Sequence, residues 1–519
     1  MPGRTAHHRP KISKMSAVEN SSANEGDAAR SSDESKKHEL VVPGKISRDW
    51  GVFLWLGLLA ATLFGILLSA PPRLGQNNED RLAEYVTDAV DHGNWICQVD
   101  ALGQVSSKPP MACWISSAAT VIVGEINRFT LYIPSALAAL FLSWIIFIVA
   151  RKHFGWRAGF LGASMYLLSN VAVNEMATCR FDALFALFVM LGAAAAFRAW
   201  RSGCGWVWFW LAAAGATLTK GPLGILLSAA GLLAVFWEKG RSGSRVRGSH
   251  FTGIALYVLI AGGWFVLAYW KLGHALVDKM IFQELFAHAA GKGKDRSGFY
   301  KPLLWFLTDF GPWSLLTLFG LWRVVKRPAA EPEERCFERF LFCWFVLGLL
   351  AFSVGGHERA RLIFPIVPAA ALLAGNELAR MTRSFSRRTQ AVGVVTCAVV
   401  MLGLVAFYYH VQRAKNFAVR ENIAMRELAE NLRKQFGKGV SITHVDSPFP
   451  LRFYLKDFRA PASVTEAATL LRGENIALVA VENSDALKKE LGSNAPSIYV
   501  LERWPRQGTP EVEIISNRP

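Results

Sequence analysis

The sequence predicts an α-helical membrane protein that crosses the bilayer many times and ends in a small α/β domain. Apolar residues make up 52% of its 519 residues and charged residues only 19%, whereas a soluble domain carries about 25% charge. The 18 Trp and 34 Phe residues suit membrane helices and their interfaces. Apolar runs recur from residue 50 to residue 410, and about twenty apolar residues are enough to cross the hydrocarbon core.

The chain is expected to begin with a disordered tail, residues 1–47. This segment is rich in Ser, Asn, Lys and Glu and nearly lacks aromatic residues, so it cannot bury enough apolar surface to offset the entropy of ordering. The apolar run from Trp50 to Ala70 follows it. Because the leader before this run is far longer than that of a cleaved signal peptide, the run is expected to remain as a signal anchor.

A membrane domain is predicted over residues 48–411, with large outer loops at 72–127 and 272–300. Within the first loop, the apolar stretch Pro109 to Gly124 is too short for a span and is predicted to be interfacial or re-entrant. Together with the anchor, ten further apolar runs give about eleven spans; these runs lie at roughly 128–150, 157–175, 179–200, 205–219, 221–238, 251–271, 301–323, 337–355, 360–378 and 389–410.

Basic residues in every second connection predict the orientation of the spans. They are Arg151, Lys152, Arg157, Arg198, Arg201, Lys239, Arg241, Arg245, Arg247, Arg323, Lys326, Arg327, Arg380, Arg383, Arg387 and Arg388. The positive-inside rule makes that side cytoplasmic, so the N-terminus is cytoplasmic and the first loop faces outward. The net charge of +17 therefore indicates orientation and does not indicate nucleic-acid binding.

The C-terminal segment, residues 412–519, is predicted to be an α/β domain on the outer face. Helical patterns at 421–435, 464–471 and 484–491 alternate with strand patterns at 440–445, 476–481 and 498–501, and an aromatic segment spans 449–458. This alternation is typical of a small α/β domain.

Several charged residues are expected to converge at outer span ends. Asp182 is costly to bury in an apolar span and is therefore a functional candidate, with a pairing to Arg180 or Arg359 as the alternative. Lys220 lies in the turn LTKGP, where it either holds a lipid-linked phosphate or merely precedes a helix break. His288 is a weak candidate metal ligand. Cys97 and Cys113 either bridge or simply pack.

The order of motifs resembles a known family. The motifs are NEDRLAE, GNW, SKPPMACWI, RFTLYIPSALAAL, RKHFGWRAG, RFDALFALF, LTKGPLGIL, FGPWSLL and RARLIFPIVPAAALLAG. In this order and spacing, across about Trp50 to His410, they resemble polyprenol-phosphate-dependent GT-C glycosyltransferases of the protein mannosyltransferase and aminoarabinose transferase type. The resemblance implies a GT-C fold and transfer of a sugar from a polyprenyl-phosphate donor to a glycolipid, protein or glycan, in a bacterial-type inner membrane.

The resemblance also implies roles for individual residues. Glu79, Asp80 and Asp182 are the expected catalytic acids, and the expected donor and phosphate ligands are Asn78, Arg81, Lys108, Lys220, Tyr300, Arg359 and Arg361. Two positions depart from the family pattern, because Asn78 replaces an Asp and Ser107 replaces a Glu. No cofactor is evident, and a divalent metal remains possible although the sequence shows no ligand set with recognisable spacing. One alternative is a catalytically degenerate protein that binds a lipid-linked sugar. A transporter is a second and less favoured alternative, because transporters commonly show internal repeats and this sequence shows none.

Overall fold

The computed structural model describes residues 43–75, 79–238, 246, 248–286, 298–354, 360–437, 441–482, 484–492, 497–504 and 512–519. The predicted disordered tail lies outside the described residues as far as residue 42. Contacts divide the chain into two units, residues 1–53 and 54–519. In the first unit, the described residues form the opening turns of helix α2, where Trp50 and Phe53 stack edge to face with ring centroids 6.4 Å apart.

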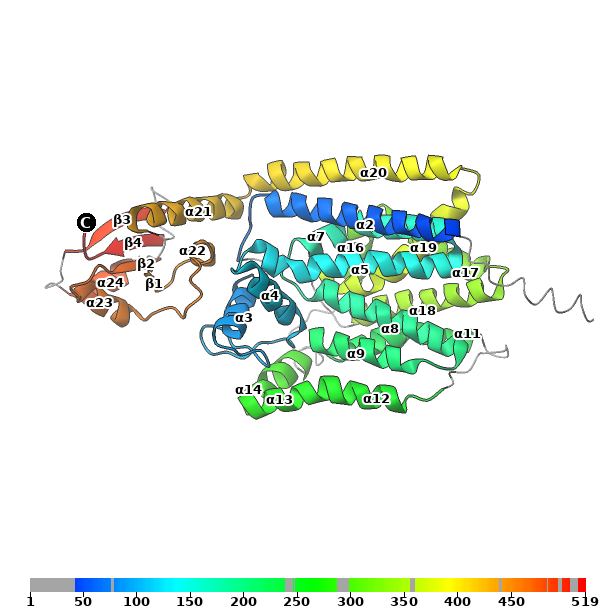
Figure 1. Cartoon of the computed structure of the whole chain (residues 1–519), viewed down its shortest axis with the longest axis horizontal. Coiled ribbons are helices and arrows are strands. Elements are labelled where there is room, and N and C mark those ends of the chain that lie inside the picture. The colour runs from blue at the N-terminus through cyan, green and yellow to red at the C-terminus, as the bar shows by residue number, and fades with distance from the viewer. Residues whose placement is uncertain are drawn as a thin grey trace, which may run out of the picture. The chain divides into compact units, whose positions relative to one another are not determined.

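The membrane part of the chain is a bundle of helices (Figure 1). In chain order these are α2 (Pro43–Ser69), α3 (Glu79–Asp91), α4 (Met111–Val123), α5 (Arg128–Phe154), α6 (Trp156–Leu167), α7 (Asn170–Met176), α8 (Asp182–Ser202), α9 (Trp206–Lys220), α10 (Leu223–Ala229), η1 (Ala230–Leu233), α11 (Ala234–Trp237), α12 (Phe251–Tyr257), η2 (Val258–Gly262), α13 (Gly263–Leu272), α14 (His274–Leu276), η3 (Val277–Phe286), α16 (Lys301–Asp309), α17 (Trp313–Lys326), α18 (Pro332–Val354), η5 (Ala360–Ile366), α19 (Val367–Met381), α20 (Arg387–Phe407), η6 (Tyr408–Gln412) and η7 (Arg413–Lys415).

Among the described residues, seven helices are long and apolar enough to cross a membrane. They cover 49–69, 128–154, 182–202, 251–272, 332–354, 360–381 and 387–415, so the protein is a multi-pass membrane protein. The predicted count of about eleven spans is not confirmed, because several of the predicted runs form shorter or broken helices. For example, the run 157–175 breaks where Ser169 caps the start of α7, and the run 301–323 breaks before Pro312.

One arginine joins the two helices that flank the loop over residues 72–127. Arg128, the first residue of α5, donates hydrogen bonds of 2.8 Å to the carbonyls of Leu67, Leu68 and Ala70. These carbonyls belong to the last turn of α2 and the residue after it, where a helix leaves its acceptors unsatisfied and favours a positive charge. Arg128 therefore fixes the start of α5 against the end of α2.

The C-terminal segment forms the predicted α/β arrangement. Helix α21 (Phe417–Phe436) leads into strand β1 (Ile442–His444), followed by α22 (Phe449–Leu455), α23 (Val464–Arg472), β2 (Leu478–Val481), α24 (Ser484–Leu491), β3 (Tyr499–Trp504) and β4 (Val512–Ser516). The sheet order is β1-β2-β4-β3, with β1 parallel to β2 and the other pairs antiparallel. The sequence did not predict β4, whose apolar run is interrupted by Glu513.

The C-terminal segment packs on α3, within the loop over residues 72–127. Phe453 and Phe458 belong to the same buried apolar cluster as Leu82 and Tyr85 of α3. Arg452 also contacts the Glu84 carboxylate of α3, with an Nη2 to Oε1 distance of 3.2 Å. Aromatic burial and a partly buried ion pair thus join α22 to α3.

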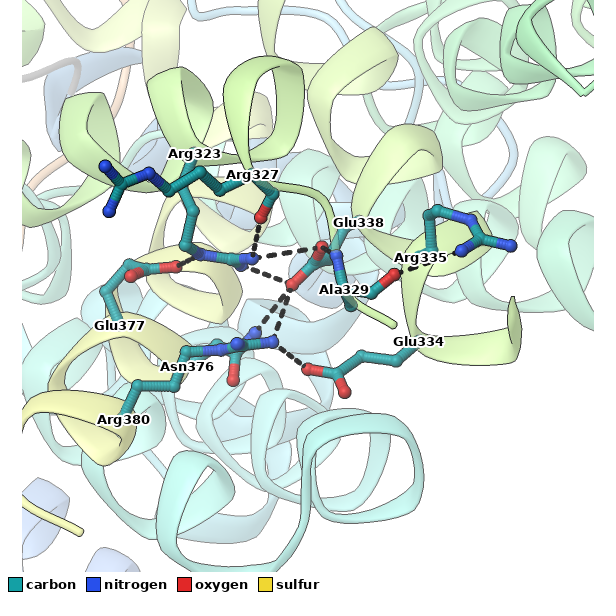
Figure 2. A network of polar contacts seen from close by, with 9 residues as sticks. All are labelled: Arg323, Arg327, Ala329, Glu334, Arg335, Glu338, Asn376, Glu377 and Arg380. Carbon is teal, nitrogen blue, oxygen red and sulfur yellow. Dashed lines mark hydrogen bonds and ion pairs between the residues drawn. The ribbon is translucent and has the colours of Figure 1, made fainter. Parts of the chain in front are cut away.

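A buried ion network joins α17, α18 and α19 at the ends of these helices (Figure 2). The guanidinium of Arg323 pairs with both Glu338 and Glu377. Glu338, which is fully buried, also accepts hydrogen bonds from Asn376 at 3.1 Å and Arg380 at 3.2 Å. Because the charges of this network are paired, the three helices are fixed relative to one another. Helix α19 directly follows η5, which carries Arg361.

Candidate functional site

The candidate site is centred on Asp182, the first residue of α8. Helices α8 and α9 form an antiparallel hairpin (Figure 1), so the start of α8 and the end of α9 lie at the same end of the bundle. Helix α9 ends at Lys220 because Gly221, at φ +111°, adopts a backbone conformation that other residues rarely take. Segment η5 packs against α8 and supplies Arg361.

These three residues form a buried charge cluster. Lys220 pairs directly with the Asp182 carboxylate, and Arg361 Nε lies 3.7 Å from its second oxygen. The Asp182 side chain is 5% exposed, whereas those of Lys220 and Arg361 are 22% and 20% exposed. The carboxylate also occupies the N-terminal turn of α8, where the helix dipole favours a negative charge. Asp182 thus orients two cations whose side chains remain partly exposed.

Two further charged residues surround the cluster. Glu175, at the end of α7, is buried and interacts electrostatically with Asp182 and Lys220. Arg180 lies between α7 and α8, and its backbone is held by Ser135, whose hydroxyl donates hydrogen bonds of 3.0 Å to the carbonyls of Thr178 and Arg180. With three cations for two carboxylates, the cluster suits an anionic phosphate.

The acids Glu79 and Asp80 of the loop over residues 72–127 lie beside this region. Cys179 shares a buried cluster with Leu82 of α3 and Tyr132 of α5, and it interacts electrostatically with Glu79, Asp80 and Arg180. Glu79 is completely buried and accepts a 3.1 Å hydrogen bond from the Tyr132 hydroxyl. Asp80, the next residue in the first turn of α3, is half-buried. Of the two acids, Asp80 is therefore the more accessible to a substrate.

The remaining predicted ligands have different surroundings. Arg81 is exposed on α3. Lys108 is half-buried, and its carbonyl accepts a 2.9 Å hydrogen bond from Ser106. Tyr300 is exposed and packs against Phe299 with ring centroids 6.0 Å apart, so its described contacts do not join it to Asp182. Three predicted residues lie outside the described part of the chain, namely Asn78, His288 and Arg359.

Other acids of the first loop support its structure. Asp88 accepts hydrogen bonds from Asn94 at 2.7 Å and from the Val99 amide at 2.9 Å, which orders residues 92–99. Burial raises the pKa of Glu84, although Arg452 pairs with it. Over the described residues, no group of three or more His, Cys, Asp or Glu side chains could hold a metal ion. Cys97 and Cys113 are both free thiols, so they do not bridge.

Asp182, Lys220 and Arg361 were predicted from the sequence, but their pairing was not. The predicted partners of Asp182 were Arg180 or Arg359, whereas the described ion pairs join it to Lys220 and Arg361. Glu175 was not predicted as a site residue. A signal was present, because Glu175 is the only acid between Glu125 and Asp182, and an acid within an apolar stretch of a membrane protein marks a functional candidate.

Sequence comparisons find known proteins that are similar to this chain. Residues 107–270 match the family model described as dolichyl-phosphate-mannose-protein mannosyltransferase. The undecaprenyl phosphate-alpha-4-amino-4-deoxy-L-arabinose arabinosyl transferase 1 of Pseudomonas fluorescens strain Pf0-1 is 26% identical over 388 residues, covering 72% of this chain and 65% of that protein. The corresponding transferase 2 of Proteus mirabilis strain HI4320 is 25% identical over 375 residues, covering 68% of this chain and 65% of that protein.

A solved structure shows the same fold. The crystal structure of ArnT from Cupriavidus metallidurans bound to undecaprenyl phosphate aligns with a TM-score of 0.66 and 18% identity, covering 90% of this chain and 98% of that chain. The sequence matches span just under two thirds of the length of the arabinosyl transferases named above. The chain therefore has the GT-C fold, and its resemblance to the polyprenol-phosphate-dependent glycosyltransferases of ArnT-like type is confirmed.

Proposed function

We propose that this protein is a membrane glycosyltransferase that moves a sugar from a polyprenyl-phosphate donor to an acceptor. The observation that carries the proposal is the Asp182 carboxylate held between Lys220 and Arg361. These cations are partly exposed and held in place in advance, as needed to stabilise the charge on a departing lipid phosphate. The arabinosyl transferases similar to this chain are named for an undecaprenyl phosphate donor, which supports the same donor class here.

The proposed reaction is a displacement at the anomeric carbon. An acceptor hydroxyl attacks that carbon, the bond to the phosphate oxygen breaks, and the lipid phosphate leaves with the bonding electrons. A carboxylate of the first loop accepts the hydroxyl proton. Asp80 is better placed for this step than the fully buried Glu79. Lys220, Arg361 and Lys108 hold the phosphate, and Asp182 keeps the first two of these cations oriented.

We further propose where the reaction takes place and what the acceptor is. The basic connections between spans put the N-terminus on the cytoplasmic side of a bacterial-type inner membrane. Residues 72–127 and the domain over residues 412–519 then face outward, where a glycolipid resembling lipid A, a protein or a glycan would accept the sugar. A lipid A-like glycolipid is the first acceptor to test.

Transfer by the purified full-length protein tests this proposal. The protein is incubated with undecaprenyl-phosphate-linked sugars carrying a radiolabel and with lipid A as acceptor. We expect the label to appear in the lipid A fraction and undecaprenyl phosphate to be released in equal amount. A protein that neither binds undecaprenyl phosphate nor transfers any sugar contradicts the proposal.

A second candidate function is a lipid-sugar binding protein that has lost catalysis. The specific observation in its favour is Asn78 at the position of a family Asp, because an amide does not accept a proton at neutral pH. The variant Asn78→Asp separates the two candidates. A gain of transfer from an inactive starting protein favours the binding protein, whereas activity of the natural chain that is lost on Asp80→Asn favours the enzyme.

A further inference from the structure

Glu175 is a buried acid to which the proposed reaction gives no role. It lies in the last turn of α7 and is 3% exposed. Its Oε2 atom has no hydrogen-bond partner within the described part of the chain. A buried carboxylate oxygen without a partner is costly, so its presence beside a charge cluster calls for an explanation.

The titratable groups around Glu175 come from several different elements. The charged groups are Asp182 of α8, Arg180 before α8, Lys220 of α9 and Arg361 of η5. Two tyrosines complete the surroundings, Tyr166 of α6 and Tyr409 of η6. The Tyr166 hydroxyl is fully buried and, like Glu175 Oε2, lacks a hydrogen-bond partner in the described structure. Tyr409 instead donates a 2.8 Å hydrogen bond to Asn174.

The protonation of Glu175 sets the charge of this cluster. Arg180, Lys220 and Arg361 face two carboxylates, so the five groups carry a net charge of +1 when both acids are ionised and +2 when Glu175 is neutral. A phosphate monoester carries close to two negative charges above its second pKa of about 6. The neutral form of Glu175 therefore matches the charge of a released lipid phosphate, whereas the ionised form opposes it.

We propose that Glu175 is a positioning residue of the phosphate site, which takes up a proton when a polyprenyl phosphate binds and so raises the net charge of the cluster from +1 to +2. The inference rests on the proposed function. Burial, together with the neighbouring Asp182 carboxylate, raises the pKa of Glu175 to about 8, so the empty site exchanges this proton near neutral pH. A bound phosphate anion favours the neutral acid further.

The linkage has a definite sign. Since phosphate binding favours the protonated acid, the part of the phosphate affinity that depends on Glu175 is present below about pH 8 and is lost as the pH rises above it. One linked proton lowers the affinity by up to tenfold per pH unit. Near pH 8 a fraction of the Glu175 side chains is ionised, so binding takes up a fraction of a proton at that site.

Titration calorimetry with undecaprenyl phosphate tests the proposal on the full-length protein in detergent. Binding heats at pH 8 in two buffers of different ionisation enthalpy give the proton uptake, for the natural protein and for Glu175→Gln. We expect the natural protein to take up more protons than the variant. Asp309→Asn serves as the matched control. The Asp309 carboxylate accepts a hydrogen bond from Asn170 of α7 but does not belong to the charge cluster. Proton uptake by this variant should equal that of the natural protein.

Each outcome decides a different question. Equal proton uptake by the natural protein and Glu175→Gln overturns the role of Glu175, and so does loss of undecaprenyl phosphate binding in a folded Glu175→Gln protein. If the variant does not fold, the natural protein still decides the matter, because an affinity that stays constant from pH 7.5 to 9.5 also overturns it. Absence of undecaprenyl phosphate binding to the natural protein contradicts the proposed function itself.

Discussion

Lys220 makes the most direct prediction for a single residue. Because its ammonium is partly exposed and held by Asp182, Lys220→Ala should weaken undecaprenyl phosphate binding by about 1.5–3 kcal/mol, the range for hydrogen bonds to charged groups. That corresponds to about 10- to 150-fold in Kd. Lys271→Ala is the matched control, because this lysine contacts Asn94 and not the cluster. Equal affinity of Lys220→Ala and Lys271→Ala would remove Lys220 from the phosphate site.

The two first-loop acids should respond differently to substitution. Tyr132→Phe removes a hydrogen bond to the fully buried Glu79 and should destabilise the fold by about 1–3 kcal/mol. Asp80→Asn changes a half-buried residue and should shift stability by only about 0.5 kcal/mol, yet lower transfer. Melting temperature in detergent and transfer rate are measured for both variants. If Asp80→Asn transfers at the natural rate, Asp80 is not the base.

Sequence reasoning at the residue scale found the charged residues but not their partners. Asp182, Lys220 and Arg361 were each identifiable, because a charge beside an apolar run is expensive. Their pairing depends on three segments that are brought together only by packing of α8 against α9 and η5. Arg323 and Arg380 were interpreted as orientation charges, since the positive-inside rule counts cations alone. Their buried partners Glu338 and Glu377 were therefore overlooked.

At the scale of elements, the buried network of α17, α18 and α19 should dominate stability. Glu338 is fully buried and pairs with Arg323 and Arg380 (Figure 2). Glu338→Gln removes one of the two carboxylates that pair with each of the Arg323 and Arg380 guanidinium groups. Breaking a buried ion pair costs about 3–5 kcal/mol. Glu331→Gln, at an exposed position just before α18, should cost at most about 0.5 kcal/mol. The free energies of unfolding of Glu338→Gln and Glu331→Gln are measured in mixed detergent. Equal values would contradict a stabilising role of the network.

Element positions were predictable where the local pattern decides them. The predicted helices at 421–435, 464–471 and 484–491 match α21, α23 and α24 closely, because their apolar periodicity is strong. The membrane runs were located correctly, but their continuity was not. Breaks such as the one at Ser169 depend on a side-chain cap to the Ala172 amide, which a count of apolar residues does not detect.

For the whole molecule, the sequence predicted a membrane part and an α/β part but not how they associate. The apolar contacts between them come from residues more than 350 positions apart, such as Leu82 and Phe453, and have no local signature. The association has a functional consequence, because α22 packs on α3, the helix that begins with Glu79 and Asp80. The C-terminal domain thereby supports the loop to which we assign the catalytic base.

Removing one aromatic contact should loosen this association. Phe453 is 3% exposed and packs with Phe458 and Tyr85 in the shared cluster, so Phe453→Ala should cost about 3–5 kcal/mol. Phe417→Ala is the matched control within the same domain, because Phe417 is 60% exposed. Limited trypsin digestion followed by mass spectrometry measures cleavage after Arg413, Lys415 and Arg420, near the start of the domain. We expect faster cleavage in Phe453→Ala than in Phe417→Ala, together with slower sugar transfer; equal cleavage rates would show that Phe453 does not hold the domain on α3.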